Sequence, residues 1–116
     1  MRAIEKISGH FIVCGFGRMG AYVCHQFSAR GIPFVIVENS PEAQLKIIDA
    51  AYHLVPGNAT EEEVLMSANI KTARGLVSVL DSDASNVYVV LSARELNPNL
   101  EIIARAGEEN AHKKLI

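Results

Sequence analysis

The 116-residue sequence is poor in cysteine and has no tryptophan. Its two cysteines, Cys14 and Cys24, form no C-x-x-C motif and have no histidine partner at a zinc-binding spacing. Both fall in apolar stretches, which predicts buried, reduced thiols. A redox-sensing role for Cys24 is the alternative. The four histidines are scattered along the sequence, so no metal site is predicted.

Long apolar runs and an excess of basic charge are also absent. No segment approaches the ~20 apolar residues of a membrane-spanning helix, and the N-terminus has no secretory signal pattern. We therefore expect a soluble, cytoplasmic domain. The formal net charge is −2, the isoelectric point is near 6.1, and Lys and Arg do not cluster. Nucleic acid is therefore not an expected partner.

The sequence does contain a regular alternation of short apolar runs with amphipathic segments. The apolar runs predict strands at residues 10–15, 33–38, 52–56, 75–80 and 101–104. The amphipathic segments predict helices at residues 20–30, 40–50 and 84–96, a further helix from Thr60, and a last one from Glu108.

Capping residues mark three of the predicted helix starts. Ser40 is followed by Pro41, a pairing typical of an N-cap and the first helical position. Thr60 and Glu63 have the spacing of a capping box. Asp83 is the predicted N-cap of the helix at 84–96.

Five strands separated by helices require parallel pairing, because each helix must return the chain across the sheet by a right-handed crossover. The sequence therefore predicts an α/β fold with a doubly wound, Rossmann-like sheet of five parallel strands in the order 3-2-1-4-5. We assign residues 9–116 to this single nucleotide-binding domain and residues 1–8 to an N-terminal linker segment.

The turn after the first predicted strand has the pattern G-x-G-x-x-G: Gly15, Phe16, Gly17, Arg18, Met19 and Gly20. In this pattern Gly15 permits a tight turn, Gly17 lets a pyrophosphate approach the backbone, and Gly20 lets the helix pack closely on the strand. The free N–H groups at the helix start then attract phosphate. A purely structural turn is the alternative, and the position between a strand and a helix favours phosphate binding.

Glu38 ends the second predicted strand, 21 residues after Gly17, where a ribose-binding acid is expected. Its carboxylate can accept hydrogen bonds from both hydroxyl groups of an adenosine ribose and would repel a 2′-phosphate. The expected ligand is therefore NAD(H) or another adenine nucleotide (ATP, ADP or AMP), and not NADP. Capping of the next helix through Asn39 and Ser40 is a second role for Glu38, compatible with the first.

Further candidate residues follow the other strands, at the edge where ligands bind in such sheets. They are Asn39, Asn58, Ala59, Thr60, Leu80, Asp81 and Arg105. Asn58 and Asp81 are expected to flank the adenine. Arg18 is placed to reach a terminal phosphate or else is an exposed side chain on the first helical turn. Arg105 is placed to neutralise phosphate charge or else pairs with Glu101 or Glu108.

No set of residues typical of nucleophilic or acid–base catalysis is apparent, and nothing resembles a hydride-transfer acid or base. We therefore predict no catalytic residues and no enzyme activity, with the nucleotide acting as a signal. The cofactor-binding half of an NAD-dependent oxidoreductase is the alternative.

From residue 10 onward the sequence resembles the N-terminal lobe of RCK domains, the regulators of potassium conductance, also called TrkA-N. The resemblance rests on four blocks: HFIVCGFGRMG at 10–20, Gly57-Asn58-Ala59-Thr60, Asp83 to Asn86 with Ala93-Arg94, and Ile102-Ile103-Ala104-Arg105-Ala106. Asn58 departs from the family's usual Asp, which puts the adenine contacts in doubt. The carboxylates of calcium-gated members are not matched at Val79, Arg105 and Gly107.

The resemblance implies a cytosolic regulatory domain that binds NAD(H), ATP, ADP or AMP and controls a potassium channel pore or the membrane subunit of a Trk/Ktr-type transporter. Residues 1–8 resemble the segment that joins such domains to a pore helix. We also expect a homodimer or a larger ring formed through residues 84–96. That helix carries Val87, Val89, Val90 and Leu91 and is apolar on more faces than one sheet can cover. The alternative is that its extra apolar residues lie under the last helix.

Overall fold

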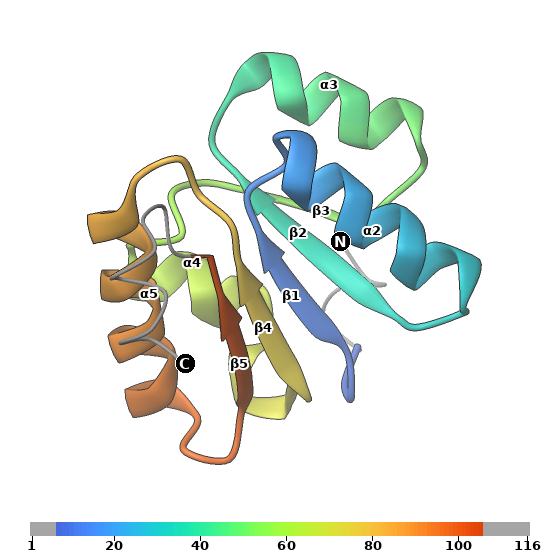
Figure 1. Ribbon diagram of the computed structural model, residues 1–116. Helices are drawn as coiled ribbons and strands as arrows, with labels where there is room; N and C mark the ends of the chain where they lie inside the picture. The colour runs from blue at the N-terminus through green and yellow to red at the C-terminus, as the bar shows by residue number, and fades with distance from the viewer. Residues whose placement is uncertain (1–6, 106–116) are drawn as a thin grey trace.

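The computed structural model describes residues 7–105, shown in Figure 1. Within this range, five strands form one all-parallel sheet in the order β3-β2-β1-β4-β5. The strands are β1 (Phe11–Cys14), β2 (Phe34–Glu38), β3 (Leu54–Pro56), β4 (Gly75–Ser78) and β5 (Glu101–Ala104). The predicted Rossmann-like fold and its strand order are confirmed. The helix predicted from Glu108 and residues 1–6 of the predicted linker lie outside the described residues.

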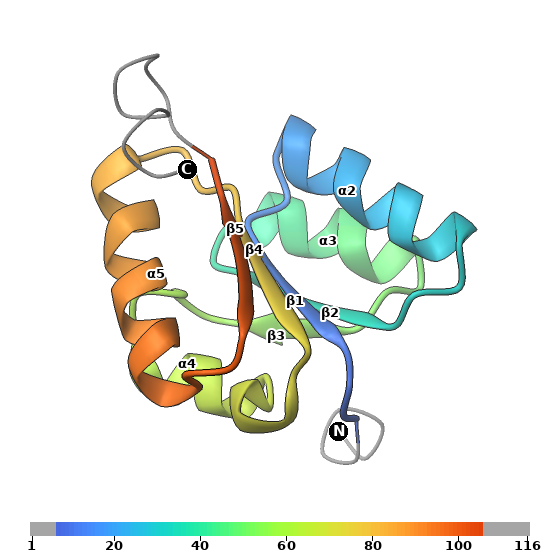
Figure 2. The same ribbon diagram turned by 60° about the horizontal axis from the view of Figure 1, so that its bottom comes forward.

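The helices cover both faces of the sheet. They are α2 (Arg18–Ala29), α3 (Pro41–Asp49), α4 (Glu62–Ser67) and α5 (Asp83–Leu96), with a 3-10 helix η1 (Ile70–Thr72). As Figures 1 and 2 show, α2 and α3 lie on one face, and α4 and α5 lie on the other. None of the described helices has both the length and the apolar character needed to cross a lipid bilayer.

The central strand β1 is buried along its whole length and shows why the apolar runs lack alternation. Ile12 and Cys14 belong to the core cluster that contains Leu65 of α4 and Val89 of α5. Phe11 and Val13 belong to the cluster on the opposite face, which includes side chains of α2 and α3. A strand covered on both faces needs an apolar residue at every position.

The carboxyl ends of the central strands are level with one another. Cys14 pairs with Val37 of β2 and with Ser78 of β4. The contact continues one residue further, because Gly15 N–H donates to the Val37 carbonyl at 3.0 Å. The glycine turn, Glu38 and the residues after Ser78 therefore meet at one edge of the sheet.

Two predicted caps are wrong, and the predicted start of α2 is two residues late. Thr60 makes no capping box with Glu63, because its N–H and its hydroxyl both donate to Oδ1 of Asn58, at 2.9 and 2.7 Å. Helix α4 consequently begins at Glu62, after a residue without a side-chain cap.

The N-cap of α5 is Ser82, whose Oγ accepts a hydrogen bond from Ser85 N–H, so Asp83 becomes the first helical residue. Asp83 still contributes a negative charge to the first turn, where it favours the helix. Helix α2 begins at Arg18, before Gly20. The predicted Ser40 cap of α3 is confirmed, with Pro41 at the first position.

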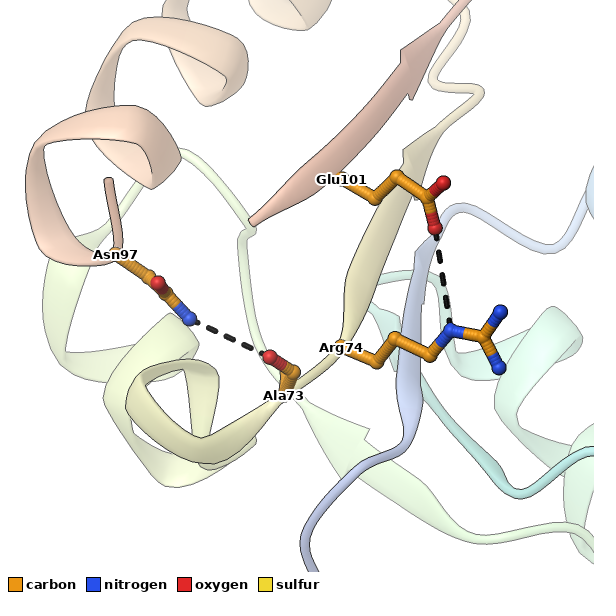
Figure 3. Close-up of polar contacts among 4 residues, drawn as sticks. All are labelled: Ala73, Arg74, Asn97 and Glu101. Carbon is orange, nitrogen blue, oxygen red and sulfur yellow. Dashed lines mark hydrogen bonds and ion pairs between the residues drawn. The ribbon is translucent and has the colours of Figure 1, made fainter. Parts of the chain in front are cut away.

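The amino edge of β4 and β5, away from the glycine turn, is tied by polar contacts (Figure 3). Asn97, after α5, donates through Nδ2 to the carbonyls of Ile70 and Ala73 at 2.8 and 3.4 Å. Arg74 pairs with Glu101 at 4.0 Å, and both side chains are two-thirds exposed. Such a pair contributes at most about 1 kcal/mol. Glu101 therefore faces Arg74, at the opposite end of β5 from Arg105.

Candidate nucleotide site

The glycine turn has its shape because side chains at two of its positions would collide with the backbone. Gly15 has a φ of +107°, and a Cβ added there would lie 2.8 Å from the carbonyl oxygen of Val79. A Cβ at Gly20 would collide with the Gly15 carbonyl oxygen. Helix α2 can thus start directly against the end of β1, which points its first N–H groups at the sheet edge.

Gly17 differs from the other two glycines of the motif. A Cβ added at Gly17 would have no heavy atom within 4 Å, so the space in front of this residue is open. Gly17 is also the N-cap of α2, and this helix has neither a side-chain cap nor an acidic residue in its first turn. The positive end of a 12-residue helix therefore faces open space, which is the arrangement that binds a phosphate.

Glu38, at the end of β2, connects the glycine turn to the start of α3. Its Oε1 accepts a 2.7 Å hydrogen bond from Phe16 N–H. Its Oε2 accepts from Asn39 N–H at 3.1 Å and from Ser40 N–H at 2.8 Å. A carboxylate oxygen can accept about two hydrogen bonds, so Oε1 keeps the capacity for one more. The predicted link to Asn39 and Ser40 is present, although the N-cap of α3 is Ser40.

A hollow of about 240 Å³ lies beside Glu38. It is lined by Val37, Glu38, Asn39, Gly57, Asn58, Ala59, Leu80, Asp81, Ser82 and Ser85. These residues lie at the end of β2, after β3 and β4, and in the first turn of α5, as expected for the carboxyl edge of a parallel sheet. We call it the small hollow.

A second hollow, the large hollow, has a volume of about 630 Å³ and lies at the start of α2. Its lining residues are Gly17, Arg18, Met19, Tyr22, Val79, Asp81 and Arg105. Two arginines thus stand beside the positive end of α2, where they add to its attraction for an anion. Asp81 lines both hollows and therefore marks their junction.

The two hollows include ten of the fourteen residues predicted for the site. The other four support them. Gly15 and Gly20 shape the turn, Phe16 is buried and donates its N–H to Glu38, and Thr60 holds Asn58. Sequence reasoning missed Tyr22, which stands one helical turn after Arg18 on α2, and Ser82 and Ser85 of the small hollow. The S-x-x-S capping pattern at 82–85 was the available signal.

The thiols and the buried histidine lie apart from both hollows. Burial raises the pKa of Cys14 and of Cys24 to about 12, so neither is a thiolate at neutral pH. This disfavours redox sensing by Cys24. His10 is buried at the start of β1, at the amino edge. Among residues 7–105, no three His, Cys, Asp or Glu side chains converge as metal ligands would.

The chain matches one family model and is similar in sequence to potassium channel proteins. The family model described as the TrkA-N domain matches residues 11–116. Potassium channel protein 1 of Methanocaldococcus jannaschii is 39% identical over 118 residues, covering 100% of this chain and 35% of the relative. Probable potassium channel protein 2 of the same organism is 42% identical over 116 residues, covering 97% and 34%. This chain therefore spans about a third of the length of these relatives.

Solved structures share the fold and include nucleotide complexes. The TrkA-N domain of the inner membrane protein YbaL from Escherichia coli has a TM-score of 0.86 and 31% identity, covering 91% of this chain and 78% of that one. The GsuK channel bound to NAD has a TM-score of 0.84 and 25% identity, covering 96% and 20%. The Kef CTD of Shewanella denitrificans, in its AMP-bound form, has a TM-score of 0.76 and 31% identity, covering 85% and 59%.

Proposed function

This chain belongs to the TrkA-N family, and we propose that it is a regulatory domain which binds an adenine nucleotide to control potassium transport. The single observation that supports nucleotide binding best is the 2.7 Å hydrogen bond between Phe16 N–H and Glu38. This bond holds the proposed ribose-binding carboxylate next to the glycine turn that is proposed to bind phosphate. The relatives whose structures hold NAD and AMP support the same ligand class.

The phosphates of the nucleotide bind at the start of α2, and its ribose binds at Glu38. The adenosine half then occupies the small hollow between Asn58 and Asp81, and further phosphates extend into the large hollow toward Arg18 and Arg105. NAD(H), ATP, ADP and AMP fit this chemistry. NADP does not, because its 2′-phosphate would face the Glu38 carboxylate.

The partner that receives the signal is a potassium channel pore or the membrane subunit of a transporter. The potassium channel relatives are about three times as long as this chain, so such a domain acts as one part of a larger transport protein. The domain then lies in the cytoplasm, on the face of the membrane where nucleotides are abundant. The ligand is bound as a signal and is not turned over.

Self-association of the domain occurs through α5. Three large apolar side chains on this helix, Val87, Tyr88 and Leu91, are exposed while Val89 on the same helix is fully buried. An apolar face of this kind on a regular helix is typical of a contact surface. Through this face, a ligand-dependent change in one domain can reach its neighbours.

An oxidoreductase half that binds NAD is the second candidate function, because the glycine turn and Glu38 would serve it equally well. Steady oxidation of bound NADH by a small substrate would favour that candidate. The potassium channel relatives favour the regulatory role.

Thermal unfolding with added nucleotide tests the proposal. A ligand at a hundredfold over its Kd stabilises the fold by roughly 2.7 kcal/mol, which for a domain of this size shifts Tm by about 10 °C. AMP, ADP and NAD should each raise Tm in this way, and equal concentrations of NADP or of adenine-free phosphate should raise it by half as much or less. No shift with any adenine nucleotide would contradict the proposal.

A further inference from the structure

Asn86 is a fully buried polar residue of α5. Both polar atoms of its side-chain amide make hydrogen bonds at the carboxyl edge of the sheet. Its Oδ1 accepts hydrogen bonds from Leu80 N–H at 2.9 Å and from the Ser78 hydroxyl at 2.7 Å. Its Nδ2 donates to the Leu80 carbonyl at 3.0 Å and to the Arg105 carbonyl at 3.5 Å. One side chain therefore satisfies both backbone groups of Leu80 and reaches the residue after β5.

The hydrogen bonds of Asn86 take over where the pairing between β4 and β5 ends. The last pair between β4 and β5 is Ser78 with Ala104, followed by a hydrogen bond from Arg105 N–H to the Ser78 carbonyl at 2.9 Å. Among residues 7–105, the strand pairing of β4 does not extend to Leu80. Backbone groups that lose water without gaining a partner are costly, so half-buried Leu80 depends on Asn86 for its position.

The residues that Asn86 holds are next to, or part of, the walls of the two hollows. Leu80 lines the small hollow, and Asp81, which follows it, lines both. Arg105 lines the large hollow. Asn86 itself lines neither. Asn86 therefore does not face either hollow, and its hydrogen bonds with Leu80 and Arg105 go to the backbone of residues that line them.

We propose that Asn86 is a positioning residue for the nucleotide site: by fixing Leu80 and the end of β5, it holds Asp81 and Arg105 where the phosphates of the ligand pass between the two hollows. This proposal rests on the proposed nucleotide binding. It assigns to α5 a direct part in setting affinity, because the helix and the wall of the site share one hydrogen-bond network.

Isothermal titration calorimetry of the 116-residue chain with ADP tests this role. Asn86→Asp keeps the size of the side chain and its acceptor Oδ1 but removes the donor to Leu80 and Arg105. We expect at least a tenfold loss of ADP affinity. The matched control is Ser78→Ala, which removes a bond to the same Oδ1 and leaves the contacts with Leu80 and Arg105 in place; its affinity should stay within threefold of the wild type.

A double-mutant cycle with Arg105→Ala separates positioning from general destabilisation. All titrations are made well below the Tm of each variant. In the Arg105→Ala background, Asn86→Asp should cost less affinity than it does in the wild type, because part of its effect passes through Arg105. Unchanged ADP affinity of Asn86→Asp, or full additivity with Arg105→Ala, would overturn the proposal. If the wild type bound none of AMP, ADP and NAD, the proposed function would be overturned instead, and this inference with it.

If Asn86→Asp does not fold, hydrogen exchange in the wild type decides the question. The Leu80 amide should exchange at least a hundredfold more slowly than an unstructured amide, and ADP should slow it further. A Leu80 amide that exchanges freely, or that does not respond to saturating ADP, would overturn the proposal.

Discussion

The Phe16 amide donates a 2.7 Å hydrogen bond to Oε1 of Glu38, a residue 22 positions further along the sequence. Phe16 belongs to the glycine turn after β1, and Glu38 ends the neighbouring strand β2. The carboxylate is thus held beside the positive end of α2 without a ligand. Binding of a nucleotide therefore loses little free energy to the ordering of these two groups.

Glu38→Ala should weaken binding of NAD and AMP by about tenfold or more, because a charge-assisted hydrogen bond contributes roughly 1.5–3 kcal/mol. The substitution should also reduce the difference in binding affinity between NAD and NADP. The control is Glu38→Gln, which keeps one acceptor for Phe16 and removes the charge. If the preference for NAD arises from charge, Glu38→Gln should narrow it as well; a preference that both variants retain would contradict the role of Glu38.

The glycines of the turn should separate folding from binding. Gly20→Ala places a Cβ against the Gly15 carbonyl oxygen and should lower the free energy of unfolding by about 1–3 kcal/mol. A Cβ added at Gly17 has no heavy atom within 4 Å, so Gly17→Val should cost stability no more than about 1 kcal/mol and should abolish nucleotide binding. Chemical unfolding and calorimetry measure the two effects. Tight NAD binding by Gly17→Val would show that phosphate does not approach the backbone there.

Arg18→Ala should weaken ADP binding more than AMP binding, by about a further tenfold, if Arg18 reaches a second phosphate. Arg30→Ala is the control for net charge, since Arg30 stands at the other end of α2 and bonds Gln26. Titration of both variants with both nucleotides gives the comparison. An equal loss for ADP and AMP would place the second phosphate elsewhere, toward Arg105.

The outer face of α5 should hold copies of the domain together. Leu91 is 65% exposed on α5, and Leu45 is 63% exposed on α3. Light scattering at tens of micromolar should give more than the monomer mass for the wild type, the monomer mass for Leu91→Lys, and the wild-type mass for the matched variant Leu45→Lys. A strictly monomeric wild type, or an assembly that survives Leu91→Lys, would contradict this surface.

The stability of the domain should fall as the pH drops below about 6.5, the ordinary pKa of histidine. His10 is buried, and desolvation lowers its pKa, so the folded state favours the neutral ring. Its Nε2 lies 2.8 Å from the Ala68 carbonyl, and Nδ1 has no partner among the described residues. The folded state thus binds fewer protons than the unfolded state below pH 6.5, and stability is lost down to the lowered pKa. Unfolding of His10→Gln should show a shallower pH dependence than that of His25→Gln, whose histidine is exposed.

The sequence predicted the fold because the apolar runs and the helix patterns agree at every element. It predicted the position of Glu38 by spacing, but could not show that Oε2 is already used by Asn39 and Ser40. Where two capping residues compete, local sequence does not decide. Ser82 rather than Asp83 caps α5. The Thr60 hydroxyl, predicted to cap the next helix, donates its hydrogen bond to Asn58 instead.

The supporting role of Asn86 lay beyond prediction from sequence, because it depends on where the ends of β4 and β5 meet in space. The same holds for Tyr22 in the large hollow. Such residues are recognised only once the sheet edge and the first turn of α2 are placed together.

The most direct test of the account is calorimetric titration of the wild-type chain with NAD and with NADP under identical conditions. We predict that NAD binds with one site per chain and at least tenfold more tightly than NADP, because only NADP brings a phosphate against the Glu38 carboxylate. Equal affinities for the two dinucleotides would contradict the assignment of this sheet edge as an adenine-nucleotide site with Glu38 on the ribose.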